Sequence, residues 1–437
     1  MKSVQCFTLS FIIILFRSDM VFGETWAVLV AGSTAWADYR HQADVAHAYQ
    51  LLVKQGVKSD KIITMMYDNI ANNPKNPYPG KIYNTPDGND VYAGLKVDYT
   101  GKNVSVATFL NVLKGNTIGN AGKGNEKVLN STIEDNVFIY FVDHGGFNIL
   151  GLPVGILTKK DLQNALDYMY TNRMYKKVLF YLDACNAGSM FEGLESEKRI
   201  FAVTASNSTE DSYSTYCYNK LKLPCLGDEF SVAWMQDSEV HNILTESVGR
   251  HVDNVARNTA NSHVSQYGDQ STRSLAVVDF QGGIGNKKFR NVITDVKTGR
   301  AWKNISINSR QVPLYMIKKK LTNPIEIAVK IKQLSLKRAK LDDLLSQIVH
   351  NAINQRNLAQ LILNRKPSRI SKTATYCHDV VIKAFDVDCA SFDSNPYAFS
   401  LSHVFANLCE VLQNPEPILQ QFRVQCLNVT KTVSVTE

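Results

Sequence analysis

Two short apolar runs, each ending in a reactive side chain, constrain this chain more than any other feature of its sequence. Residues 137–142 lead into Asp143-His144-Gly145, and residues 178–182 lead into Asp183-Ala184-Cys185. Both runs are rich in β-branched and aromatic residues, which is typical of strands buried on both faces. The segment 160–173 between them has the length and composition of a crossover helix, so the pattern predicts a parallel βαβ unit.

The carboxyl ends of parallel strands meet at one edge of a sheet, and α/β proteins place their reactive groups there. A thiolate attacks a carbonyl far better than a thiol does, and a neighbouring imidazole can act as its base. Either residue alone would be read as an ordinary core residue, but the two together favour catalysis. We therefore interpret Cys185 as a nucleophile and His144 as its base and acid, with the N–H groups of Gly145 and Cys185 as oxyanion donors.

Further apolar patterns fill in a mixed α/β fold. Strands are expected at 26–32, 61–67 and 200–205, a last edge strand at 274–280, and helices at 41–53, 106–113, 228–235 and 239–256. The fold class is α/β, with a mostly parallel six-stranded sheet flanked by helices. Composition changes near residue 282, and residues 325–363 have a helical pattern. These patterns predict that the chain divides into four parts, residues 1–23, 24–285, 286–324 and 325–437.

The N-terminus has the form of a secretory signal peptide. Lys2 precedes an apolar run at 7–16 that is too short to span a bilayer, and cleavage is expected after Gly23. No later stretch has the length of a transmembrane anchor. The net charge of +8 is mild and forms no compact basic stripe, so nucleic-acid binding is not expected.

The cysteine count fits an oxidising compartment. Of 8 cysteines, Cys6 leaves with the signal peptide and seven remain. If pairing follows proximity, Cys217 and Cys225 pair, the four C-terminal cysteines staple the helical part, and Cys185 is the odd thiol. Glycosylation sequons lie at Asn103, Asn130, Asn207, Asn304 and Asn428.

Several short motifs together resemble one family. They are residues 39–44 (Tyr-Arg-His-Gln-Ala-Asp), 65–68, 97–101, 143–145, 188–191 and 226–228, together with the four-cysteine tail. This set resembles the legumain (asparaginyl endopeptidase) family of caspase-like cysteine peptidases, over nearly the whole chain after the signal peptide. The resemblance implies protein and peptide substrates, a caspase-like domain at 24–285, a linker or activation peptide at 286–324 and a helical inhibitory prodomain at 325–437.

The resemblance also implies a pocket for an Asn side chain. A primary amide presents one acceptor and two donors, so its pocket needs a cation beside an anion. By resemblance, Arg40 faces the amide oxygen, Asp183 and Asp228 accept from its NH₂ group, and Ser212 forms a wall. Protonated Asp has a similar shape, which implies secondary cleavage after Asp at acid pH.

Three positions depart from the family pattern. Asp183 stands where Glu is usual and is one methylene shorter. Asn186 replaces an acidic residue. Asp38 replaces the usual Asn near the catalytic His, and a carboxylate there is expected to raise the pKa of His144.

The C-terminal region resembles the prodomain that covers the cleft in this family. By resemblance, Cys377 pairs with Cys409, and Cys389 pairs with Cys426. Self-cleavage is implied after Asn323, but the next residue is Pro324, which lacks the N–H that proteolysis usually needs. Asn304, Asn308 or another protease are the alternatives for activation.

Other interpretations stay open from the sequence. One is a transamidase or peptide ligase of the same family, and another is a catalytically weak inhibitor or binding homologue.

Cystatin-type inhibitors are implied partners, beside the chain's own prodomain. A lysosome-like or vacuole-like acidic compartment, or secretion, is expected. No cofactor is expected, and no metal either, because no His/Cys cluster shows ligand spacing.

Overall fold

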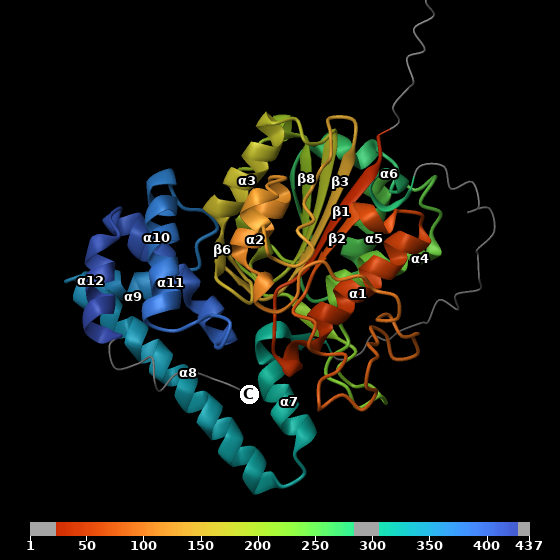
Figure 1. Ribbon diagram of the computed structural model, residues 1–437. Helices are drawn as coiled ribbons and strands as arrows, with labels where there is room; N and C mark the ends of the chain where they lie inside the picture. The colour runs from red at the N-terminus through yellow and green to blue at the C-terminus, as the bar shows by residue number, and fades with distance from the viewer. Residues whose placement is uncertain (1–22, 284–305, 427–437) are drawn as a thin grey trace, which may run out of the picture.

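A six-stranded sheet forms the centre of the computed structural model, which describes residues 23–283 and 306–426 (Figure 1). From edge to edge the strands are β11 (Ser265–Gly268), β8 (Ile200–Thr204), β7 (Lys177–Asp183), β3 (Asn136–Val142), β1 (Thr25–Ala31) and β2 (Ile62–Met65). β11 is antiparallel to β8, and the other five strands are parallel. The predicted α/β class with a mostly parallel six-stranded sheet is confirmed.

Helices cover both faces of this sheet (Figure 1). α2 (Val106–Leu113) and α3 (Lys159–Thr171) lie on one face, and α1 (Tyr39–Lys54), α4 (Glu229–Val240) and α5 (Val248–Asn258) lie on the other. Alternate side chains of a strand point to opposite faces. Val28 and Val30 therefore pack with α2 and α3, whereas Ala27 and Leu29 pack with α1, α4 and α5. Burial on both faces explains why these strands read as continuous apolar runs.

The edge strand predicted at 274–280 is wrong. This segment follows the 3-10 helix Gln270–Ser274, which Asp269 caps, and continues into the short helix α6 (Val278–Gln281). Its apolar residues Val277 and Phe280 are buried inward instead of alternating along a sheet edge. The true edge strand, β11, reads Ser-Gln-Tyr-Gly, and a single aromatic residue leaves no strand pattern to detect.

Two small sheets lie beside the large one. One is formed by β4 (Gly145–Gly146), β5 (Ile149–Gly151) and β6 (Ile156–Thr158), and it begins directly after His144. The other joins β10 (Gly227–Asp228), β9 (Tyr213–Thr215) and β12 (Ile307–Asn308). β12 comes from the segment that the sequence assigned to a linker, so this part of the chain returns to the α/β domain.

The C-terminal part is helical, as predicted. It contains α7 (Val312–Lys320), α8 (Pro324–Ala352), α9 (Arg356–Asn364), α10 (Lys372–Asp388), α11 (Ser402–Leu412) and α12 (Glu416–Gln425). Disulfides join Cys377 to Cys409 and Cys389 to Cys426, and a third joins Cys217 to Cys225 in the α/β domain. In Figure 1, α9 to α12 form a compact group beside β6 and α3, and α8 runs from that group to α7.

Across the described ranges, no helix combines the length and the apolar character that a membrane crossing requires. The predicted signal peptide, apart from Gly23, lies outside these ranges, as do Cys6, Asn304 and Asn428.

Candidate active site

His144 and Cys185 leave the sheet from neighbouring strands. β3 and β7 pair in parallel with Val142 opposite Asp183, so both chains leave at the same edge. A Cβ added to Gly145 would lie 2.6 Å from the carbonyl oxygen of Cys185. The backbones after the two strands therefore approach closely, and a side chain at Gly145 would push them apart.

A buried ion pair holds the His144 ring. Asp38 ends the short 3-10 helix before α1 and places its Oδ1 3.0 Å from His144 Nε2. Burial favours the neutral ring, but the attraction of Asp38 outweighs it and raises the pKa of His144. Burial also opposes ionisation of Asp38, yet His144 and Arg40 together hold its pKa well below the usual range. The carboxylate at position 38 thus stabilises an imidazolium.

Cys185 is a buried thiol with weak polar contacts. Its Sγ accepts from the Ser212 N–H at 3.4 Å and lies 3.7 Å from the Ser212 hydroxyl. Burial raises the pKa of the thiol to about 11, and the positive charge of Arg310 offsets only part of that effect. In this state Cys185 therefore keeps its proton at neutral pH. It is the free cysteine of the described residues.

A fully buried arginine joins this dyad to a second acidic group. Arg40 Nε donates to Asp228 Oδ1 at 2.9 Å, and Nη1 donates to Asp38 Oδ1 at 3.0 Å. Within the described residues, Arg40 Nη2 and Asp228 Oδ2 are buried without a hydrogen-bond partner. Buried polar groups cost free energy when they stay unpaired. The pair thus presents one unsatisfied donor beside one unsatisfied acceptor.

Asp183 is held by α4 instead of by a cation. Its Oδ2 accepts from the Ser231 N–H at 3.1 Å and from the Ser231 hydroxyl at 2.7 Å. Burial, followed by repulsion from Asp228, raises its pKa well above the usual range. Asp44 is a third buried carboxyl, and it accepts from the Asp228 N–H at 3.0 Å. Burial and Asp228 raise its pKa too.

Three contributors to this cluster were not identified from the sequence, namely His41, Asp44 and Ser231. His41 Nδ1 lies 2.8 Å from the Ser33 hydroxyl, and its Nε2 lies 3.6 Å from Asp228 Oδ2. A usable signal existed in α1, where Arg40, His41 and Asp44 interrupt a helix whose other residues are largely apolar and buried. Ser231 carried no comparable signal.

A short covering strand, residues 306–311, lies against the Ser212 wall. Its β12 pairs antiparallel with β9, and the Ser309 N–H donates to the Ser212 carbonyl at 3.1 Å. The Ser309 hydroxyl lies 3.3 Å from that of Ser214 and 3.4 Å from that of Ser212. The covering strand therefore adds itself to the sheet that contains Asp228.

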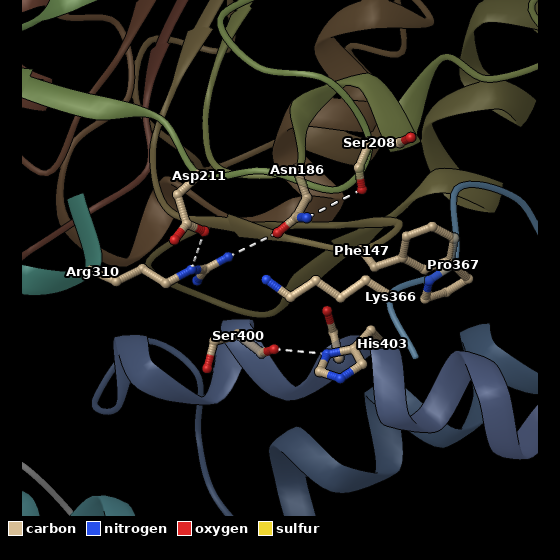
Figure 2. Close-up of a pocket in the computed structure, with 10 residues that line it drawn as sticks. Phe147, Asn186, Ser208, Asp211, Arg310, Lys366, Pro367, Ser400 and His403 are labelled. Carbon is tan, nitrogen blue, oxygen red and sulfur yellow. Dashed lines mark hydrogen bonds and ion pairs between the residues drawn. The ribbon is translucent and has the colours of Figure 1, made fainter. Parts of the chain in front are cut away.

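Arg310 fastens the covering strand to Asp211 and Asn186 (Figure 2). Its Nε donates to Asp211 at 2.6 Å, and its Nη2 donates to Asn186 Oδ1 at 2.9 Å and to the Gly145 carbonyl at 3.0 Å. The neighbouring Asn308 donates to Asp211 at 3.0 Å. Nothing in the sequence around Arg310 distinguishes it from other basic residues of the linker.

The helical region completes the cover. A Cβ added to Gly146 would lie 2.3 Å from the carbonyl oxygen of Phe399, so the two chains touch there. The ring centroids of His144 and Phe399 are 6.1 Å apart. A small pocket remains between Arg310 and Asn186 on one side and Lys366, Ser400 and His403 on the other (Figure 2). Residues 306–311 and the helical region thus bury both His144 and Cys185.

The remaining predicted sites occupy varied positions. Asn130 is exposed, and Asn103 and Asn207 are half-buried. The Asn207 side chain accepts from the Thr209 N–H at 2.8 Å. Asn323 is exposed and caps α8, where its side chain accepts from the Ile325 N–H at 2.9 Å.

Comparison with known proteins finds similar sequences over the α/β domain and over most of the chain. The model of the "Peptidase C13 family" matches residues 25–283, more than half of the chain. Legumain of Rattus norvegicus is 38% identical over 405 residues, which cover 91% of this chain and 90% of that protein. Hemoglobinase of Schistosoma mansoni is 38% identical over 390 residues, covering 88% and 87%.

Among solved structures, caspase-1 from Spodoptera frugiperda aligns over 57% of this chain and 92% of its own, with a TM-score of 0.34 and 9% sequence identity.

Proposed function

This chain belongs to the peptidase C13 family and is a cysteine endopeptidase; we propose that it is made as a zymogen and cleaves peptide bonds after Asn. One observation carries the specificity. Arg40 Nη2 and Asp228 Oδ2 are a buried donor and acceptor that no described residue satisfies. The oxygen of an Asn side chain would accept from the first, and its NH₂ group would donate to the second.

Asp183 would have a supporting role in this pocket. Ser231 donates to Oδ2 of Asp183, so this carboxyl helps to fix the N-terminus of α4. The same carboxyl would also face the substrate amide. A protonated Asp side chain offers a similar acceptor and donor. Cleavage after Asp would therefore appear as the pH falls toward the pKa of that side chain.

We assign Cys185 and His144 to a thioester mechanism. The Cys185 sulfur attacks the scissile carbonyl carbon as its thiol proton passes to the neutral form of the His144 ring, and the N–H groups of Gly145 and Cys185 stabilise the oxyanion. His144 then gives its proton to the departing amine as the C–N bond breaks. Water attacks the thioester while His144 accepts its proton, and the thiol is regenerated. Asp38 holds the ring and keeps its proton available.

The covering strand and the helical region are proposed to act as an intramolecular inhibitor. Ser309 lies on the Ser212 wall, and Arg310 occupies the space beside Cys185, so a substrate strand has no room. Activation would cut between residues 286 and 324, at Asn323 or Asn308. Asn323 is exposed but precedes Pro324, whereas the Asn308 side chain is engaged by Asp211.

Compartment and partners follow from the same proposal. Three disulfides and a signal peptide fit the secretory pathway, and an acidic lysosome-like compartment or secretion would provide the trigger for release. Cystatin-type inhibitors would bind the uncovered cleft.

The test is hydrolysis of an Ala-Ala-Asn reporter peptide by acid-treated protein, compared with the Cys185→Ala variant. Cleavage after Asn in the wild type and none in the variant supports the proposal. Mass spectrometry of the shortened enzyme identifies the activating bond. An added amine nucleophile reveals any ligase product by its mass. Absence of cleavage after removal of the helical region would favour the binding-protein interpretation instead.

A further inference from the structure

A second polar cluster lies at the other end of α4 from the proposed substrate pocket. Asp237 Oδ1 lies 2.9 Å from His241 Nδ1, and Asp237 Oδ2 lies 2.7 Å from His251 Nδ1. Glu246 Oε1 lies 3.7 Å from His241 Nδ1. Two imidazoles and two carboxylates, from the end of α4, the following turn and the start of α5, thus lie in one cluster.

The spacing of these atoms suits a tetrahedral ion. Zinc holds nitrogen and oxygen ligands at roughly 2.0–2.2 Å, which places the ligand atoms of a tetrahedral site roughly 3.3 Å apart. The distances of 2.7, 2.9 and 3.7 Å bracket that value. One ligand atom each from Asp237, Glu246 and His251 can be chosen so that all lie within 4.8 Å of one another.

Burial leaves this cluster with an uncompensated carboxylate. Asp237 and Glu246 are 3% and 5% exposed. Glu246 Oε1 accepts from Asn254 Nδ2 at 3.2 Å, but Oε2 is buried without a hydrogen-bond partner among the residues that the structure describes. A cation would satisfy this orphaned oxygen, which is the usual solution for buried carboxylates.

We propose that Asp237, His241, Glu246 and His251 form a binding site for a divalent transition-metal ion, with zinc as the best match. Neutral imidazoles with carboxylates are ligands that such ions prefer. The His241 side chain is 38% exposed, which gives the ion a path from solvent. The His251 ring stacks on Tyr181 of β7, with planes 5° apart, so it is held in place.

The ion would have a structural role. Asp228 precedes α4 and Asp237 lies nine residues later, so the metal site is roughly 14 Å along the helix from the proposed substrate pocket. The ion would fasten the last turn of α4 to α5 and would not touch substrate. Without the ion, the same residues form a plain hydrogen-bonded cluster in which two imidazoles bracket Asp237.

The test uses full-length protein carrying Cys185→Ala, because a free thiol also binds zinc. Equilibrium dialysis with Zn²⁺ near neutral pH, and visible absorption with Co²⁺, should show one bound ion per chain. Saturating Zn²⁺ should raise Tm by roughly 5 °C, since a ligand that binds only the folded state stabilises it. His241→Gln, His251→Gln and Glu246→Gln should each weaken binding at least about tenfold.

His47→Gln is the matched control. His47 also lies beside α4, with its Nε2 3.1 Å from Glu239 Oε1, but it is not part of the cluster of Asp237, Glu246 and His251. It should bind Zn²⁺ as the parent does. His241→Gln is the variant least able to disturb folding, since its ring is partly exposed. Absence of bound ion in the Cys185→Ala protein would overturn the proposal. Equal binding by the parent, His241→Gln and His251→Gln would do so too.

Discussion

The two surfaces that meet over Cys185 are held by different kinds of contact. On the α/β side, Arg40 pairs with Asp38 and Asp228, and these side chains are at most 5% exposed. On the helical side, Lys383 joins Asp161 at 2.7 Å while 43% exposed. Removing one partner of a buried pair leaves the other charge buried and unpaired, which is strongly destabilising. Exposed pairs contribute only roughly 0–1 kcal/mol to the free energy of unfolding.

Under the proposed function, this difference would separate a permanent site from a removable cover. The proposed substrate pocket is built from buried pairs, so its geometry would persist when the cover leaves. The covering strand has one charged anchor, Arg310, whose side chain is 9% exposed and donates to Asp211, Asn186 and the Gly145 carbonyl. A zymogen of the kind proposed needs this combination.

The largest effect is expected from Arg40→Lys on the permanent side. Lysine keeps the charge but cannot donate to Asp38, Asp228 and a substrate amide together. We expect kcat/KM of the activated enzyme for an Asn reporter to fall roughly 100- to 1,000-fold. Steady-state hydrolysis measures this, with circular dichroism to verify folding. Lys54→Met on the same helix is the control, and a fall of less than tenfold would mean that the pocket lies elsewhere.

A smaller effect is expected from Arg310→Met on the removable side. Loss of the anchor should increase hydrolysis by the uncleaved precursor about tenfold at neutral pH, because each lost charge-assisted hydrogen bond weakens the covering strand. The positive charge of Arg310 also favours the Cys185 thiolate, so its loss alone would slow the reaction. An increase in the hydrolysis rate would therefore mean that substrate reaches Cys185 more easily. Lys318→Met, in the exposed part of α7, should leave the rate unchanged.

Acidification should act on the helical side through His378. Its ring lies 6.4 Å from that of Phe147, and its Nε2 lies 3.3 Å from the Ser402 carbonyl. Burial lowers the pKa of His378 to about 4, against 6.5 for an exposed ring, and Ser402 and Asp379 offset only part of this shift. The unfolded or released state binds the extra proton, so stability is lost as pH falls from 6.5 to 4, by up to about 3 kcal/mol.

His378→Gln should remove most of that loss, because Gln donates to the Ser402 carbonyl without titrating. Thermal unfolding of the precursor measured between pH 4 and 7 gives the size of the effect. His263→Gln is the control, since that exposed residue pairs with Glu210 of the α/β domain. Equal acid sensitivity in the wild type and in His378→Gln would assign the trigger to other groups.

The smallest effect is expected from Lys383→Met. Its pair with Asp161 bridges the two sides, its pair with Asp379 lies within α10, and the Lys383 side chain is 43% exposed. We expect the free energy of unfolding to change by less than about 1 kcal/mol, and high salt to mask even that difference. Urea unfolding of the precursor measures it. A loss of several kcal/mol would mean that surface pairs hold the cover, which would contradict the comparison.

The sequence predicted the sheet edge where His144 and Cys185 meet, because β3 and β7 are buried at every residue after their first. Such strands carry a continuous apolar signal, and the polar residues that follow mark where each strand ends. β11 was missed because an edge strand buries little and therefore shows no pattern. The sequence did not indicate Asp237, His241, Glu246 and His251 as ligands, because their irregular spacing matches no ligand motif and only the packing of α4 against α5 brings them together.

What the sequence determined by itself is local. Strand runs, helical spacing and a shared sheet edge for His144 and Cys185 follow from the periodicity of burial. Only the tertiary structure decided which charges meet. Arg310 contacts Gly145 across 165 positions, and Arg40 contacts Asp228 across 188. Such pairs leave no local pattern, because their stability depends on how whole elements pack and exclude water around them.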